Sequence, residues 1–416
     1  MAETVNCDLR INGGSLLNTD TSELNLGDVA IKGDQIIAIE DVPDNYVAAR
    51  TIDATGLIVT PGIIDLHTHV AGGLRRSSPY VEDMMQDADT AGVHSGVTTV
   101  VDAGSCGIAN IGGLVNHVIP SAKTRVLALL NVGSLGVNRI PEVTSALDIE
   151  HDAAVATIQS RKDVIIGVKA RMVSPGIAEL GIDLPKAAKA IAKDAGVRLM
   201  VHMGDTVDQS DAAMDVAPKI LAEMLEEGDI VTHSFTSARG GLIGGDRTLL
   251  REAVDARGRG VKFDIGVGGR NFSFDAAKRV LDGGLIPDTI SSDVTLTSRY
   301  AGTAFSQIDS IGKVMSLGIG LEEALVMATR NPAAVLGSEA ERLLGCMAPG
   351  THADLTILRV HEGEWEFIDG DGNINIGNLA LEPVSCIRAG QVMPIDYGPR
   401  EGGWLPNRKS ARSLSC

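Results

Sequence analysis

The feature that most constrains the fold is an apolar, β-branched run that recurs along the middle of the chain. The eight runs begin near Ile63, Val97, Arg125, Val164, Arg198, Ile230, Val261 and Thr289. Successive starts lie 28 to 39 residues apart, close to the roughly 30 residues of one strand–helix unit. Eight such units predict an α/β chain folded as a (β/α)8 TIM barrel, whose strands are buried on both faces. A doubly wound open sheet is the alternative, but no GxGxxG motif follows the first run.

The two ends of the chain share a sequence pattern that differs from that of the middle. Short strand-like segments separated by turn residues occupy the first 58 residues, and similar segments return at 353–358 and 364–368. We therefore expect residues 1–58 and 347–400 to form one small β-sandwich domain and residues 59–346 to form the barrel. The last stretch, 401–416, is polar and rich in Gly, Ser and Arg, and is expected to be a loosely held tail.

Composition narrows the range of partners. The formal net charge is −18, and such an acidic surface argues against binding nucleic acid or anionic membranes. The first residues lack the basic and apolar regions of a secretory signal, so we expect a cytoplasmic protein. The five cysteines include no CxxC pair, which argues against a disulfide framework and a cysteine-based zinc site.

Polar residues that can bind metals stand where the predicted strands end. His67 and His69 close the first run, and their i, i+2 spacing directs both rings to the same face. The same class of position is occupied in later runs by Lys169, His202, His233 and Asp293. In a TIM barrel the carboxyl ends of the strands form the active-site face, so these side chains are expected to converge there.

Each of these residues also has an ordinary interpretation. A single histidine at a strand end is more often a core or capping residue than a metal ligand, whereas the His67–His69 pair is far more specific. Lys169 could bind a phosphate or reach solvent, and Asp293 could cap a helix. The interpretation of the other residues as metal ligands therefore depends on the His67–His69 pair.

Two strings resemble signatures of the amidohydrolase superfamily: VTPGIIDLHTH at residues 59–69 and PGTHADL at 349–355. Within it, the chain resembles the deacetylase-like metallohydrolases related to dihydroorotase. That narrower resemblance rests on GVTTVVDAGS at 96–105, GVKAR at 167–171 and PDTISSD at 287–293.

The resemblance implies a binuclear metal centre. His67, His69 and Asp293 would hold one divalent ion, His202 and His233 the other, and a CO2-derived carbamate on Lys169 would bridge both. Imidazole and carboxylate ligands suit zinc, with manganese as an alternative. The implied nucleophile is a hydroxide bridging the metals, and the implied proton carrier is Asp293.

Substrate residues are less strongly indicated. Four are expected to line the barrel mouth and bind substrate: Arg171, Ser105, Arg270 and Asn271. Arg171 could instead form an ion pair at the rim, and the loop arginines Arg75 and Arg76 are further candidates. The deacetylase-like relatives are expected to carry His at Val267, and often another near Val294 and Thr295, which leaves the substrate preference open.

These patterns predict a metal-dependent hydrolase of a small amide or ester, an N-acyl or O-acyl compound that could bear a carboxylate. The alternatives are a cyclic amidohydrolase of the dihydroorotase or hydantoinase kind, a deaminase of an amidine-type ring, and a non-catalytic scaffold. The expected partner is a small-molecule substrate, and by analogy with related barrels the chain is expected to form a homo-oligomer.

Overall fold

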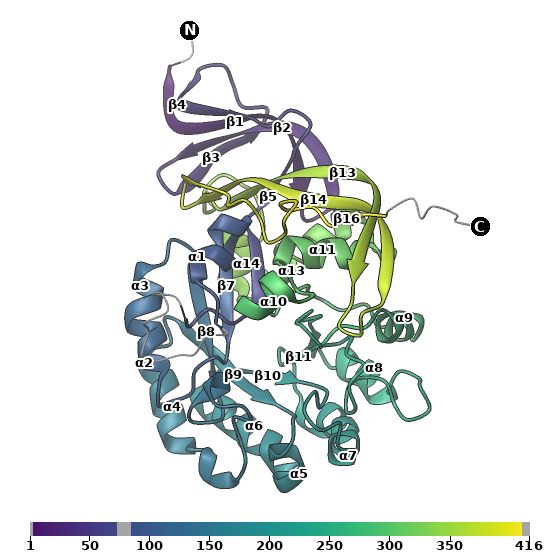
Figure 1. Cartoon of the computed structure of the whole chain (residues 1–416). Helices are drawn as coiled ribbons and strands as arrows, with labels where there is room; N and C mark the ends of the chain where they lie inside the picture. Colours follow the sequence, from purple (N-terminus) through teal and green to yellow (C-terminus); the bar gives the residue numbers. More distant parts are fainter. Residues whose placement is uncertain (1–2, 73–84, 410–416) are drawn as a thin grey trace, which may run out of the picture.

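The computed structural model describes residues 3–72 and 85–409. Figure 1 shows two parts: a sheet built from both chain ends, in purple and yellow, and below it a barrel in blue to green. Within the described residues, no helix is both long enough and apolar enough to span a bilayer.

The barrel is built on a seven-stranded parallel sheet in which neighbours in sequence are neighbours in space. Its strands are β6 (Ile63–Thr68), β7 (Val97–Ala103), β8 (Arg125–Asn131), β9 (Ile165–Arg171), β10 (Arg198–His202), β11 (Ile230–Thr232) and β12 (Lys262–Phe263). All seven coincide with predicted runs, and their side chains are almost entirely buried, which explains the lack of alternation in their sequences.

The eighth predicted run closes the barrel without forming a regular strand. Thr289 makes a parallel bridge to Asp264, just after β12, and Val294 makes one to Thr68 of β6. Asp293 N also donates to His67 O at 2.7 Å. Since segment 289–294 bonds to both outer strands, the fold is a closed barrel, and the open doubly wound sheet is excluded.

Helices surround the barrel strands (Figure 1). They are α1 (Ala88–Ala91), α2 (Ile111–Gly113), α3 (Ile119–Ser121), α4 (His151–Ser160), α5 (Gly176–Leu180), α6 (Asp183–Ala195), α7 (Asp211–Lys219), α8 (Arg251–Gly258), α9 (Phe274–Asp282), α10 (Leu296–Ala301), α11 (Gln307–Met315), α12 (Leu321–Val326), α13 (Arg330–Leu336) and α14 (Ser338–Leu344). In α6, Leu184, Ala188 and Ile191 recur at helical spacing and are buried. The helix ends at Gly196, whose φ of 70° suits a glycine.

The chain ends form one nine-stranded sheet. Its strands are β1 (Val5–Asn18), β2 (Glu23–Lys32), β3 (Gln35–Glu40), β4 (Tyr46–Asp53), β5 (Ile58–Pro61), β13 (Leu355–Ile368), β14 (Ile374–Arg388), β15 (Gln391–Met393) and β16 (Asn407–Arg408). Strand β5 joins the two ends, because it pairs with β1 on one side and β13 on the other. Residues from both ends share one apolar core, which includes Ile11, Ile31 and Ile357.

The segment expected to be a loosely held tail is packed as far as it is described. Trp404 is buried, and its indole Nε1 donates to Asp396 O at 3.1 Å. Strand β16 pairs with β13, and the Arg408 guanidinium lies 5.0 Å from the Trp365 ring. Because of these contacts, residues 401–409 are part of the folded unit, although their polar composition did not indicate it. Residues 410–416 lie outside the described residues.

Candidate metal centre

Six side chains predicted from strand ends line one pocket of about 420 Å³ at the carboxyl end of the barrel strands. They are His67, His69, Lys169, His202, His233 and Asp293. All six are buried. Their convergence follows from the parallel topology, because every strand of the barrel ends at the same face.

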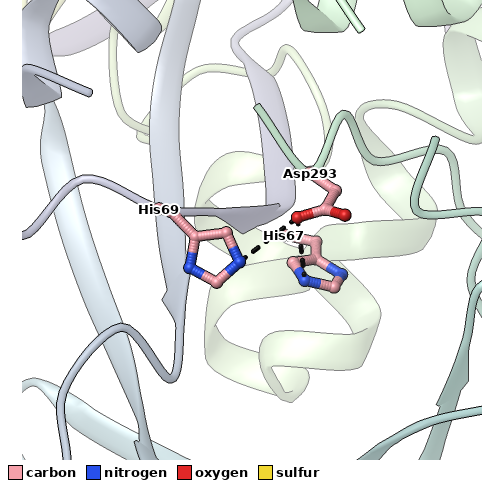
Figure 2. A group of neighbouring side chains, drawn as sticks. All are labelled: His67, His69 and Asp293. Atoms are coloured by element: carbon pink, nitrogen blue, oxygen red, sulfur yellow. Dashed lines mark ion pairs between the residues drawn. The ribbon is translucent and has the colours of Figure 1, made fainter. Parts of the chain in front are cut away.

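The tightest group consists of His67, His69 and Asp293, whose potential ligand atoms all lie within 4.8 Å of one another. Asp293 Oδ1 lies 3.2 Å from His69 Nε2 and 3.5 Å from His67 Nε2. Figure 2 shows the carboxylate facing both rings. Asp293 has a φ of 49°, a conformation that non-glycine residues seldom adopt and that often marks functional positions.

The remaining three residues adjoin this group. Lys169 Nζ lies 3.2 Å from His67 Nε2. The rings of His202 and His233 have centroids 4.1 Å apart, and those of His67 and His233 are 4.9 Å apart. Lys169 therefore contacts the first group, while His202 and His233 form a second pair beside it.

Hydrogen bonds behind the rings fix which nitrogen faces the pocket. His202 Nε2 donates to Gly204 O at 3.0 Å, and His233 Nδ1 donates to Gly266 O at 2.7 Å. Because a carbonyl only accepts, the other ring nitrogen of each residue carries a lone pair when the imidazole is neutral. His233 Nε2 is buried and has no hydrogen-bond partner among the described residues, as expected of an atom that binds a metal.

The other two imidazoles are supported by hydroxyls. His67 Nδ1 lies 3.0 Å from Thr232 Oγ1, and His69 Nδ1 lies 2.9 Å from Ser105 Oγ. In both residues this leaves Nε2 to face Asp293. Each of the four rings is thus held by one nitrogen and presents the other.

Burial holds these groups in the protonation states that metal binding requires. It lowers the pKa of His67 and His202 well below the usual value, and that of His233 to about 3. Burial also lowers the pKa of Lys169 to about 7, although Asp293 opposes this shift. His67, His202 and His233 are therefore neutral at pH 7, and Lys169 has a substantial fraction of uncharged, nucleophilic amine.

Asp293 is ionised in the same surroundings. Burial favours its neutral form, but the hydrogen bond to His69 and the partial positive charge of Lys169 oppose burial, and the pKa of Asp293 is lowered. A carboxylate among imidazoles is a donor set suited to divalent transition metals. The residues present therefore fit the metal centre that the sequence implies.

The four predicted substrate residues have three different environments. Arg270 and Asn271 line the pocket, and Asn271 Nδ2 also donates to Asp293 Oδ2 at 3.0 Å. Arg171 lines the pocket too, but its Nη1 pairs with Glu142 Oε2 at 3.1 Å, the rim ion pair weighed as the alternative. Ser105 is fully buried behind His69 and supports that ring instead of facing the cavity.

Two of the three departures from the expected family pattern lie in the core. Val267 and Val294 pack in the hydrophobic core and are not among the residues that line the pocket. Thr295 does line it, and its hydroxyl caps α10. Arg75 and Arg76 lie outside the described residues.

Several pocket residues were not predicted. Val137 and Ile140 form an apolar patch, while Thr206, Thr297 and Ser298 contribute hydroxyls. They belong to loops and to α10, where no strand end marks them. Their only sequence signal is that they follow predicted barrel strands, the regions that build the active-site face of such barrels.

Comparison with known proteins decides the family. The model of the Amidohydrolase family matches residues 58–380, most of the chain. This chain belongs to the amidohydrolase family. The amidohydrolase is 32% identical to a deacetylase of Agrobacterium fabrum (strain C58 / ATCC 33970) over 378 residues, covering 90% of this chain and 88% of the relative.

Solved structures agree with that assignment. An adenine deaminase superimposes on the amidohydrolase with a TM-score of 0.83 and 28% identity, covering 93% of this chain and 100% of the other. A dihydroorotase gives a TM-score of 0.79 and 27% identity, covering 93% and 99%. The amidohydrolase is therefore an enzyme, a hydrolase that acts on carbon–nitrogen bonds.

Proposed function

We propose that this amidohydrolase uses two divalent metal ions to remove an acyl group from a small amide or ester. The observation that carries the proposal is the common orientation of the four imidazoles. Each has one nitrogen hydrogen-bonded to the protein, and the Nε2 atoms of His67 and His69 lie within 3.5 Å of Asp293 Oδ1. A non-catalytic scaffold has no need of this arrangement.

In this proposal His67, His69 and Asp293 hold one ion, and His202 and His233 hold the other. Lys169, as a carbamate formed when its neutral amine adds to CO2 and loses a proton, would be a ligand of both. Zinc suits these ligands best, and manganese is the alternative. Bound there, the ions would polarise the substrate carbonyl and lower the pKa of water from 15.7 to about 7.

Asp293 is the proton carrier. It takes a proton from the attacking water and returns it to the leaving nitrogen or oxygen. Asn271 holds Asp293 Oδ2 at 3.0 Å and so fixes the plane of the carboxylate. The depressed pKa of Asp293 keeps it ready to accept a proton at neutral pH.

The pocket walls favour a substrate with an anionic group and an apolar part. Arg270 forms no ion pair with any other described residue, so its guanidinium is available for a substrate carboxylate. Arg171 is neutralised by the buried Glu142 and is the weaker candidate for that role. Val137 and Ile140 offer an apolar surface in the same pocket.

Similarity supports acyl removal over deamination. The Agrobacterium fabrum deacetylase covers nearly the whole chain at 32% identity, whereas an adenine deaminase of Rhizobium etli is 26% identical and only 59% of it is covered. Opening of a cyclic amide is the second candidate, favoured by the structural similarity to a dihydroorotase.

A substrate screen tests this function. Zinc-loaded and manganese-loaded protein would be assayed with N-acetyl amino acids, acetylated hydroxy acids, dihydroorotate, hydantoins and adenine. We expect carboxylic acid release from an acylated substrate. Ring opening without acyl release would instead establish the cyclic amidohydrolase, and ammonia release from adenine alone would contradict the proposal.

A further inference from the structure

A fully buried carboxylate lies directly behind the candidate metal centre. Asp264 follows β12, and three hydroxyls from two neighbouring segments surround it. Thr232 and Ser291 each donate to Oδ2 at 2.7 Å, and Thr289 donates to Oδ1 at 2.8 Å. Burial raises the pKa of Asp264, and the hydrogen bonds from these hydroxyls oppose that shift by favouring the ionised form. An ionised carboxylate only accepts, so all three hydroxyl protons then point at Asp264.

One of these hydroxyls continues to a proposed metal ligand. Thr232 Oγ1 also lies 3.0 Å from His67 Nδ1. A hydroxyl has a single proton, and Thr232 gives its proton to Asp264, so toward His67 it can only accept. His67 Nδ1 must therefore carry a hydrogen, which leaves the lone pair on Nε2, the atom that faces Asp293 and Lys169.

The role of Asp264 follows from comparing the hydrogen-bond partner of His67 with those of His202 and His233. His202 and His233 are held by backbone carbonyls, which accept and never donate, so their tautomers are fixed without further help. A hydroxyl beside His67 could donate or accept equally well. The carboxylate behind Thr232 removes that choice.

We propose that Asp264 is a positioning residue, which acts through Thr232 to hold His67 in the Nδ1–H tautomer that leaves Nε2 free to bind a metal ion. The inference rests on the metal centre of the proposed function. Asp264 also accepts a hydrogen bond from Ser291, which does not contact His67.

Zinc affinity of matched variants tests the tautomer relay. Thr232→Val removes the hydroxyl that contacts both Asp264 and His67, while Ser291→Ala removes an equally short hydrogen bond to the same Asp264 oxygen without touching His67. Affinity is measured by competition with a chromophoric chelator, and folding by circular dichroism. We expect Thr232→Val to bind zinc about 10–100-fold more weakly, with Ser291→Ala and Thr232→Ser near wild type.

Equal zinc affinity in Thr232→Val and Ser291→Ala would overturn the relay while leaving the metal centre intact. Absence of zinc binding by the wild type would instead contradict the proposed function itself. The two failures are therefore distinguishable.

A second measurement needs no variant of the relay. In wild-type metal-free protein labelled with ¹⁵N-histidine, the signals of His67 are assigned by their loss in His67→Gln. Nitrogen shifts of the Nδ1–H tautomer are the expected result. An Nε2–H tautomer at His67 would overturn the proposal, even if Thr232→Val failed to fold.

Discussion

Asn271 binds one carboxylate oxygen of Asp293, while the other oxygen faces His67 and His69. Its amide Nδ2 donates to Oδ2 at 3.0 Å, and Oδ1 is left facing His67 and His69 at 3.5 and 3.2 Å. One oxygen is thus positioned by the protein, and the other faces the candidate metal ligands. In the proposed mechanism this arrangement would let Asp293 serve both as a metal ligand and as the proton carrier.

Asp293→Asn removes the proton-accepting carboxylate but keeps its size and an oxygen ligand. Turnover of the substrate found in the screen should fall by about 10²–10⁴-fold, the usual contribution of a general base. Some metal should remain bound, which elemental analysis would show. Asp371→Asn, at an exposed turn residue, is the control and should match wild type. Wild-type turnover in Asp293→Asn would reject its role.

Lys169 should react with CO2 in a pH-dependent way. Burial brings its pKa down to about 7 from an ordinary value of 10.5, so the uncharged amine becomes dominant above pH 7. Only that form attacks CO2. In metal-free protein at constant CO2 pressure, the ¹³C carbamate signal should therefore increase between pH 6 and pH 8. Lys169→Met should lack the signal, and a signal that persisted in this variant would assign the carbamate elsewhere.

Arg270 should determine affinity for anionic substrates. Arg270→Ala removes a charged partner whose hydrogen bonds are worth about 1.5–3 kcal/mol, so KM for a carboxylate substrate should rise by roughly 10–100-fold with kcat little changed. The KM for an uncharged analogue of the same substrate should not change. The exposed Arg239, outside the pocket, provides the Arg239→Ala control. An equal loss for charged and uncharged substrates would argue against carboxylate recognition.

Asp354 joins the barrel to the sheet of the chain ends. It is almost fully buried, pairs with Arg125 at 3.0 Å and Arg388 at 3.4 Å, and accepts from Ala389 N at 2.7 Å. Asp354→Ala leaves two partly buried guanidinium groups without their carboxylate. We expect the free energy of unfolding to fall by about 3 kcal/mol, measured by denaturant titration of the metal-free protein. Surface substitutions typically change the free energy of unfolding by no more than about 0.5 kcal/mol. A change no larger than that in Asp354→Ala would show that the junction does not depend on this cluster.

Much of the architecture could be predicted because the governing signals are local. Continuous apolar runs indicated barrel strands, and strand ends identified six of the residues that line the pocket, from His67 to Asp293. Parallel topology then required those ends to meet. No knowledge of loop conformation was needed.

What could not be predicted depends on side-chain direction and on partners distant in sequence. Ser105 follows a barrel strand just as the histidines do, yet it turns behind His69, since the pocket side of that ring faces Asp293. The sequence left open whether Arg171 binds substrate or forms a rim ion pair, because its partner Glu142 lies 29 residues earlier in the chain. Asp264 carried no motif, and only its three hydroxyl partners reveal its importance.

The most direct test of the two-metal centre is elemental analysis of wild-type protein and of Lys169→Met, both purified without chelators and supplied with zinc and bicarbonate. We predict two ions per wild-type chain and a loss of at least one in the variant, because Lys169 is the only ligand assigned to both ions. Wild-type protein that holds no ion, or a variant that keeps both, would contradict the account.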